Sequence, residues 1–207
     1  MLLVALTGGI AVGKSVVAAV LKDLGCTIHD SDAVAHDLMS PDSPAWEEIV
    51  SHFGSGILNP DRTINRKQLG RIVFASESER LRLNGILHSR IMKSRQDRLE
   101  ALERDGTHTI FVSEAALTVE AGFATFYDKV IVVHCGELLQ IQRLMDRNRI
   151  DRAEAERAIQ SQMPQNEKKK HGHYLIDSSG SMAETVERTE IVYRHLVLDY
   201  ELKQHHG

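Results

Sequence analysis

The sequence has few cysteines, no long apolar run and no large charge excess. Its 207 residues include two cysteines, Cys26 and Cys135, which lie far apart in apolar stretches, so no disulfide framework is expected. No uninterrupted apolar stretch reaches the roughly 18 residues that a membrane-spanning helix needs. The sequence also does not open with a charged segment followed by a long apolar core, so no secretory leader is expected. We therefore predict a cytoplasmic protein with reduced thiols and no membrane association.

The charge balance argues against general binding to nucleic acids. There are 25 Lys and Arg residues against 29 Asp and Glu, a net charge of −4, whereas nucleic acids and membranes usually call for a strongly basic face. A local basic run, KKKHGHY at Lys168–Tyr174, is interpreted as a solvated rim that attracts phosphate. The 11 histidines have scattered spacings that predict no zinc site. We expect no nucleic-acid partner, and the sequence does not specify an oligomeric state.

Short strand candidates alternate with helical patterns along the chain. The strand candidates, rich in apolar and β-branched residues, lie at 2–7, 27–30, 109–113, 129–134 and 173–177. Apolar residues recur at helical spacing in 15–24, 45–53, 66–74 and 78–103. This alternation predicts an α/β fold in which a parallel sheet with right-handed crossovers is flanked by helices.

One long gap does not fit a plain crossover between strands. The segment between Asp30 and Thr109 contains helical patterns and a turn cluster at Gly54–Thr63, but no strand candidate. We interpret about residues 31–104 as a helical insertion at the edge of the sheet. Residues 1–30 and 105–207 are then the core of a single domain that spans 1–207.

The stretch GGIAVGKS follows the first strand candidate and opens the first helical pattern. Gly8, Gly13, Lys14 and Ser15 match G-x-x-x-x-G-K-[ST], whose glycines let consecutive backbone N–H groups converge on a phosphate. In this pattern the lysine reaches the β- and γ-phosphates and the serine holds Mg²⁺. A chance match in a glycine-rich turn is the alternative, but the strand, loop and helix context favours a nucleoside triphosphate. The expected ATP-binding residues are Gly8, Gly9, Ile10, Ala11, Val12, Gly13, Lys14, Ser15 and Val16.

Other motifs narrow the class of protein that uses this triphosphate. A GTPase would need an Asn-Lys-x-Asp motif, which does not occur, and DSSG at Asp177–Gly180 lies too late in the chain. A motor or AAA-type ATPase would be larger and would carry an acidic pair after an apolar strand, whereas TIFVSEAAL offers only Glu114. A small-molecule kinase fits the size best.

HDSDAVAHDL places two carboxylates at the end of the second strand candidate. The carboxyl ends of parallel strands face the ligand crevice, so a carboxylate there can accept the proton of an attacking hydroxyl. The alternative is that an aspartate at such a turn caps the following helix. We assign Asp32 to chemistry and Asp30 to geometry or the metal shell.

Seven motifs in register resemble the dephospho-CoA kinase family. They are TGGIAVGKS, DSD, PDRTINRKQLGRIVF, LNGILHSRI, ALTVE, QIQRLMDR and YLIDSSGS, and they cover nearly the whole chain. The resemblance implies transfer of the γ-phosphate of ATP, with Mg²⁺, to the ribose 3′-hydroxyl of dephospho-CoA. It also implies a P-loop kinase core, an inserted helical substrate-binding region and a lid at about 148–172. Another small-molecule or nucleotide kinase, or a non-catalytic ATP-binding module, remains as an alternative.

The resemblance also implies roles for individual residues. Asp32 corresponds to the acid-base residue near the ribose hydroxyl, Lys14 to the P-loop lysine, and Arg143 to an arginine that stabilises charge on the transferring phosphoryl group. Positioned cations and one carboxylate supply most of the catalysis in such a reaction. Taken without the motif, Arg143 would be read as part of a solvated helix face. Further expected residues are Asp30, His88 and Glu120 at the substrate, and Arg147 and Arg157 in the lid.

Several positions depart from the family pattern. Ala11 and Val12 stand where the family usually has glycine and a small residue, which reduces backbone freedom and is expected to place an apolar side chain beside the phosphates. In the lid, Ala158 stands where an arginine is expected, and Arg157 lies one place earlier. The other departures are Ser89 after His88, Ala116–Val119 before Glu120, and Ser178 in place of an asparagine near the adenine.

Overall fold

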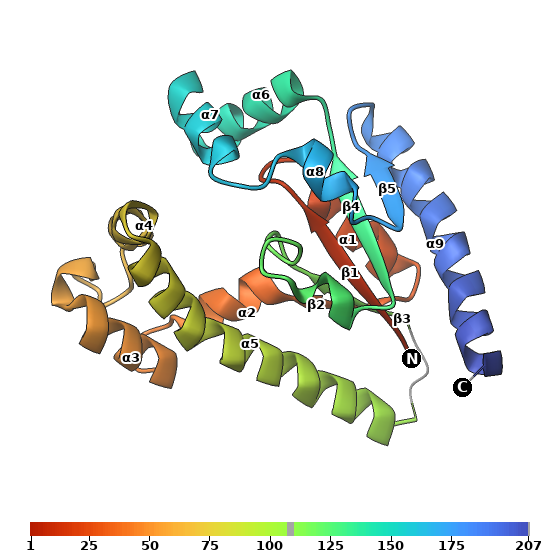
Figure 1. Cartoon of the computed structure of the whole chain (residues 1–207), viewed down its shortest axis with the longest axis horizontal. Helices are drawn as coiled ribbons and strands as arrows, with labels where there is room; N and C mark the ends of the chain where they lie inside the picture. Colours follow the sequence, from red (N-terminus) through yellow and green to blue (C-terminus); the bar gives the residue numbers. More distant parts are fainter. Residues whose placement is uncertain (107–109, 207) are drawn as a thin grey trace. The chain divides into compact units, whose positions relative to one another are not determined.

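A computed structural model describes residues 1–106 and 110–206 and contains one five-stranded sheet (Figure 1). The strands are β1 (Leu2–Gly8), β2 (Thr27–Asp30), β3 (Ile110–Glu114), β4 (Lys129–His134) and β5 (Tyr174–Asp177). They pair in the order β2-β3-β1-β4-β5, and every pairing is parallel. This confirms the predicted α/β fold with a parallel sheet; of the strand candidate 109–113, Thr109 lies outside the described residues.

Both faces of the central strands are buried, as expected for a parallel sheet covered by helices. Val4 and Leu6 of β1 point to the larger core cluster, which α1 (Lys14–Asp23) and α9 (Met182–His206) complete. Ala5, between them in sequence, points to the opposite face and packs with residues of β4. The helix α9 also runs beside β5 (Figure 1). The period of two along each strand therefore matches the two apolar faces.

The chain divides into two compact units. One comprises Met1–Asp30 with His108–Gly207 and contains the sheet, and the other comprises Ser31–Thr107. The helices of the second unit are α2 (Ser31–Leu38), α3 (Pro44–Phe53), the 3₁₀ turn η1 (Ser55–Ile57), α4 (Arg66–Ala75) and α5 (Glu77–Arg104). They enclose their own apolar cluster around Trp46 and Ile49. The predicted helical patterns at 45–53, 66–74 and 78–103 correspond to α3, α4 and α5.

Side-chain caps explain where these helices begin. Ser43, Asn65 and Ser76 each accept a hydrogen bond from a backbone N–H in the first turn of α3, α4 and α5. Pro44 at the first position of α3 adds a fixed backbone φ. The predicted turn cluster at Gly54–Thr63 contains η1 and ends beside a bridge between Leu58 and Ile64.

Three helices of the sheet unit lie between β4 and β5. They are α6 (Glu137–Asn148), α7 (Arg152–Gln160) and α8 (Gln165–Lys169), and the 3₁₀ turn η2 (Phe123–Phe126) precedes β4. α7 starts with a capping box formed by Asp151 and Glu154. Apolar residues of α6 and α7 pack against Ile10 and Ala11 of the loop after β1. In the described part of the chain, no helix is both long enough and apolar enough to cross a bilayer.

Candidate phosphate-binding and nucleotide site

The loop from Gly8 to Ser15 connects the central strand β1 to the start of α1. Gly13 occupies the N-cap of α1 with a φ of 86°, a conformation that glycine adopts without strain. A Cβ on Gly8 would lie 2.6 Å from the Val133 carbonyl oxygen, so only glycine fits there. The loop thus aims the N-terminus of a helix at the carboxyl edge of the sheet, where an anion is favoured.

Lys14 is held by a carboxylate at the end of β3. Its Nζ lies 2.7 Å from Glu114 Oε1, and the two side chains are 12% and 9% exposed. The parallel register brings Glu114 opposite Leu6 of β1, next to the loop. Sequence reasoning noted Glu114 but gave it no place in the site. The signal was available, because Glu114 ends a buried strand just as Asp30 does.

Ala11 and Val12, the two departures within the loop, differ in backbone conformation and in burial. Ala11 has a φ of 59°, in the left-handed region where a side chain is strained. Val12 is fully buried in the main core cluster and contacts neither solvent nor the crevice. The expectation that Val12 adds an apolar side chain beside the phosphates is therefore wrong, because its side chain turns inward to pack.

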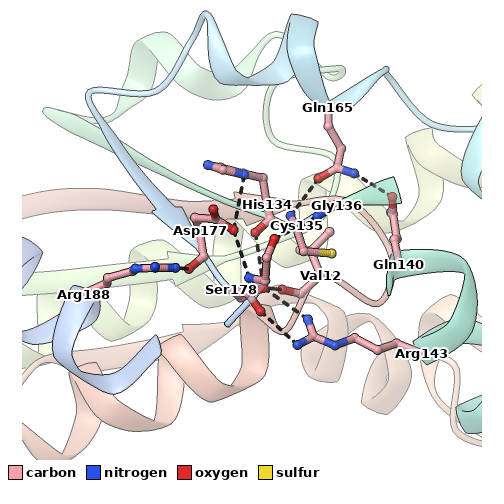
Figure 2. A network of polar contacts seen from close by, with 11 residues as sticks. Val12, His134, Cys135, Gly136, Gln140, Arg143, Gln165, Asp177, Ser178 and Arg188 are labelled. Atoms are coloured by element: carbon pink, nitrogen blue, oxygen red, sulfur yellow. Dashed lines mark hydrogen bonds and ion pairs between the residues drawn. The ribbon is translucent and has the colours of Figure 1, made fainter. Parts of the chain in front are cut away.

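Arg143 of α6 is tied to the loop through Ser178 (Figure 2). Its Nη1 donates to Ser178 Oγ at 3.2 Å and its Nη2 donates to the Ser178 carbonyl oxygen at 2.9 Å. Ser178 is 2% exposed, and its Oγ donates to the Val12 carbonyl oxygen at 2.5 Å. Arg143 is thus not part of a solvated helix face, and the Ser178 hydroxyl connects α6, the end of β5 and the phosphate-binding loop.

A cavity of about 280 Å³ lies between these elements. Its lining residues are Ala11, Gly13, Ser15, Val16, Arg143, Arg147, Ser178, Gly180, Met182 and Thr185. The cavity therefore joins the start of α1 to two arginines of α6 and to the segment after β5. Half-apolar, half-polar walls of this kind suit an aromatic base with a charged chain attached.

Of the two expected lid arginines, one lines this cavity and one does not. Arg147 is exposed, lines the cavity and donates from Nε to the side chain of its neighbour Asn148 at 3.0 Å. Arg157 is exposed on α7. Ala158, one position later, packs in the cluster that contains Ile10 and Ala11. Arg157 therefore lies on a different face of α7 from the position where the family pattern has its arginine.

Glu120 lies in the segment after β3 and pairs with Lys168 of α8. Lys168 Nζ is 2.7 Å from Glu120 Oε1 and donates to the Ala116 carbonyl oxygen at 2.7 Å. The Lys168 side chain is only 1% exposed. The interpretation of KKKHGHY as a solvated rim is wrong for this residue, because one of three consecutive helical positions faces the protein interior.

The remaining expected residues lie at the end of β2 and in the second unit. Asp30 ends β2 opposite Glu114 of β3 and directly precedes α2, the position of a helix cap. Asp32 is exposed in the first turn of α2, where a negative charge is favoured by the helix dipole. His88 is half-buried on α5, and desolvation lowers its pKa.

The oxygen donors beside the loop suit Mg²⁺. Ser15 is exposed in the first turn of α1, and the carboxylates of Asp30 and Glu114 end neighbouring strands of the same unit. Across the described residues, no group of three or more His, Cys, Asp or Glu side chains could cage a metal ion. Mg²⁺ commonly keeps several waters and binds through one or two protein oxygens plus substrate phosphates. Ser15 and these carboxylates are compatible with that mode.

Comparisons with known proteins agree over nearly the whole chain. A model of the dephospho-CoA kinase family matches residues 2–184. A dephospho-CoA kinase from Halalkalibacterium halodurans is 42% identical, covering 89% of this chain and 91% of the relative. One from Geobacter metallireducens is 42% identical, covering 95% of this chain and 98% of the relative. The solved structure of a dephospho-CoA kinase from Campylobacter jejuni matches with a TM-score of 0.65 at 26% identity, covering 93% of this chain and 96% of that structure.

Proposed function

The chain belongs to the dephospho-CoA kinase family, and we propose that it transfers the γ-phosphoryl group of ATP to the ribose 3′-hydroxyl of dephospho-CoA. The observation that carries this proposal is the intact loop Gly8–Ser15 within the family match, with Lys14 at its end held beside a carboxylate. The products are coenzyme A and ADP.

The phosphate-binding loop supplies the electrostatic part of the mechanism. Backbone N–H groups of Gly8–Val16 at the start of α1 hold the phosphates of ATP, and Lys14 exchanges its contact with Glu114 for the β- and γ-phosphates. Ser15 would hold Mg²⁺ together with the phosphates, and the bound ion would neutralise charge on the transferring group. The loop backbone is fixed by β1 and α1 before the reaction, so its N–H groups favour the transition state without reorganisation.

Asp32 acts as the general base in this proposal. Its carboxylate accepts the proton of the 3′-hydroxyl while the hydroxyl oxygen bonds to the γ-phosphorus and the bond to the β-phosphate oxygen breaks. The base of ATP occupies the 280 Å³ cavity, with Arg143 on its wall. The Arg143 guanidinium stabilises negative charge on the transferring phosphoryl group.

The other expected residues have supporting roles. Asp30, His88 and Glu120 contribute to the dephospho-CoA site, and Arg147 and Arg157 belong to a lid at about 148–172. The insertion at about 31–104 binds the acceptor. A cytoplasmic location fits the free thiols of the two cysteines, which are both buried.

An acceptor assay with one matched pair of variants tests the proposal. Purified protein is given ATP, Mg²⁺ and dephospho-CoA, with adenosine and AMP as competing acceptors, and only dephospho-CoA is expected to gain phosphate. Asp32→Asn keeps the size but removes the basicity, so kcat is expected to fall about 10²-fold or more. Binding of a non-hydrolysable ATP analogue, measured by calorimetry, is expected to stay unchanged.

Asp37→Asn is the control, because Asp37 lies exposed on the same helix and its carboxylate is 3.8 Å from the exposed His36 ring. Transfer to AMP or adenosine in preference to dephospho-CoA would indicate another nucleotide kinase. Tight ATP binding without any transfer would indicate a binding module. Equal turnover in wild type and Asp32→Asn would remove Asp32 from the mechanism.

A further inference from the structure

Two glutamine side chains hold one peptide of the phosphate-binding loop from the side of α6 and α7. The Ile10 N–H donates to Gln162 Oε1 at 2.7 Å, and the Ile10 carbonyl oxygen accepts from Gln140 Nε2 at 2.8 Å. Both polar groups of Ile10 are therefore bound by carboxamides rather than by backbone. Gln140 lies on α6, and Gln162 lies between α7 and α8.

A third glutamine anchors this pair to the end of the sheet. Gln165 Nε2 donates to Gln140 Oε1 at 2.7 Å, and Gln165 Oε1 accepts from the Cys135 N–H at 3.1 Å (Figure 2). Gln140 is 1% exposed and has both ends of its carboxamide bonded. A buried carboxamide that is bonded at both its nitrogen and its oxygen is costly to disturb.

The glutamines also explain a glycine that the phosphate-binding pattern does not require. The pattern specifies Gly8 and Gly13 but leaves position 9 open. A Cβ on Gly9 would lie 3.0 Å from Gln140 Nε2 and 3.5 Å from Gln162 Oε1. Glycine at this position therefore lets the two carboxamides approach the loop.

We propose that Gln140 and Gln162 are positioning residues for phosphoryl transfer, which fix the Ile10 peptide so that the following N–H groups of the loop face the phosphates. This inference rests on the proposed kinase function. Ala11, the next residue, has a φ of 59°, and a strained conformation persists only where its surroundings hold it. Since Gln162 and Gln165 belong to the segment around α7 and α8, the same bonds connect that segment to the loop.

The kinetic test uses variants that remove one carboxamide at a time. Gln162→Met keeps the length of a half-buried side chain but offers no acceptor to the Ile10 N–H. We expect kcat with dephospho-CoA to fall about tenfold or more, because misplaced reacting groups slow the chemical step, while KM for ATP changes less than about threefold. Gln142→Met is the control, since its side chain is exposed and its Nε2 donates to Asp146 of the same helix.

A double variant separates positioning from a merely structural role. Gln140→Met and Gln162→Met act on the same peptide, so the double variant is expected to be no more than about threefold slower than the slower single variant. Amide hydrogen exchange of the loop peptide that contains Ile10 is expected to be about tenfold faster in Gln162→Met than in wild type. If Gln140→Met does not fold, Gln162→Met decides alone.

The outcomes of these tests distinguish the positioning role of the glutamines from the proposed kinase function. A Gln162→Met kcat within about twofold of wild type, a loss confined to KM, or losses that multiply in the double variant would overturn the positioning role. A wild-type protein that does not phosphorylate dephospho-CoA would instead overturn the proposed function. In that case unchanged loop exchange in Gln162→Met would overturn the positioning role, and faster exchange would support it.

Discussion

Removing Lys168 is expected to destabilise the protein more than removing any exposed lysine. Its ammonium group is 1% exposed and bonds to Glu120 Oε1 and to the Ala116 carbonyl oxygen, each at 2.7 Å. The other Glu120 oxygen, Oε2, is buried and has no hydrogen-bond partner among the described residues. In Lys168→Met the apolar stem is replaced, but the Glu120 carboxylate and the Ala116 carbonyl lose the ammonium group that binds them.

The magnitude follows from the burial of the two partners. Breaking a buried ion pair by removing one partner costs about 3–5 kcal/mol, because the other charge is left uncompensated. Glu120 retains 20% exposure, so water can reach it in part and the lower end of this range applies. A loss of about 3 kcal/mol corresponds to a fall in Tm of roughly 6–12 °C for a chain of this size.

Equilibrium urea unfolding and thermal unfolding of three variants measure this effect. Lys170→Met is the control, since its side chain is 68% exposed at the end of α8 and pairs with the exposed Glu167, and we expect a change below about 0.5 kcal/mol. Glu120→Gln added to Lys168→Met is expected to restore part of the loss, because the uncompensated charge is then gone. A Lys168→Met variant within about 1 kcal/mol of wild type would refute the reasoning.

Three further predictions concern the loop and the end of the sheet. Lys14→Ala is expected to lower kcat about 10²-fold or more in the acceptor assay, because a cation that stabilises the transition state is lost. It is also expected to lower Tm, because the buried Glu114 carboxylate is left without its cation. Unchanged turnover would exclude Lys14 from catalysis. Ala11→Gly is expected to raise the unfolding free energy by about 0.5–1 kcal/mol, since relief of left-handed strain exceeds the entropy of glycine; a fall in stability would show that the φ of 59° is not strained. Burial lowers the pKa of His134 below 6.5, so on acidification the imidazole is protonated in the unfolded chain before it is protonated in the folded protein, and stability is expected to fall as the pH drops below 6.5. In His134→Gln this fall in Tm with pH is expected to be smaller. A Tm profile identical to that of wild type would show that His134 does not cause the fall.

Local patterns were sufficient to predict the strands and the phosphate-binding loop. The strand candidates 27–30 and 129–134 have the same bounds as β2 and β4, and the loop follows from Gly8, Gly13 and Lys14 at fixed spacing. These features depend on residues close in sequence, so short-range reasoning finds them. The helix caps at Ser43 and Asn65 are also local features, since each capping side chain lies three residues before the N–H that it binds.

The partners of the site residues could not be found in this way. Lys168 is one of three consecutive lysines, and only the packing of α8 decides which of them faces Glu120, 48 positions earlier in the sequence. Glu114 could be placed at a strand end, but its pairing with Lys14 depends on β3 lying next to β1. Sheet order is a tertiary property, and a single sequence does not fix it.

The departure at Ala11 illustrates how such distant contacts change the meaning of a local pattern. Considered alone, alanine in place of glycine weakens the loop, because the left-handed conformation costs about 1–2 kcal/mol for a residue with a side chain. The two carboxamide bonds to Ile10 come from residues 130 and 152 positions away, and a hydrogen bond of this kind contributes about 0.5–1.5 kcal/mol. The two bonds together are similar in size to the strain at Ala11. The glutamines can therefore hold Ala11 in the left-handed conformation that glycine adopts without strain. Ala11→Gly in the Gln162→Met background is therefore expected to recover more activity than Ala11→Gly adds to the wild-type chain.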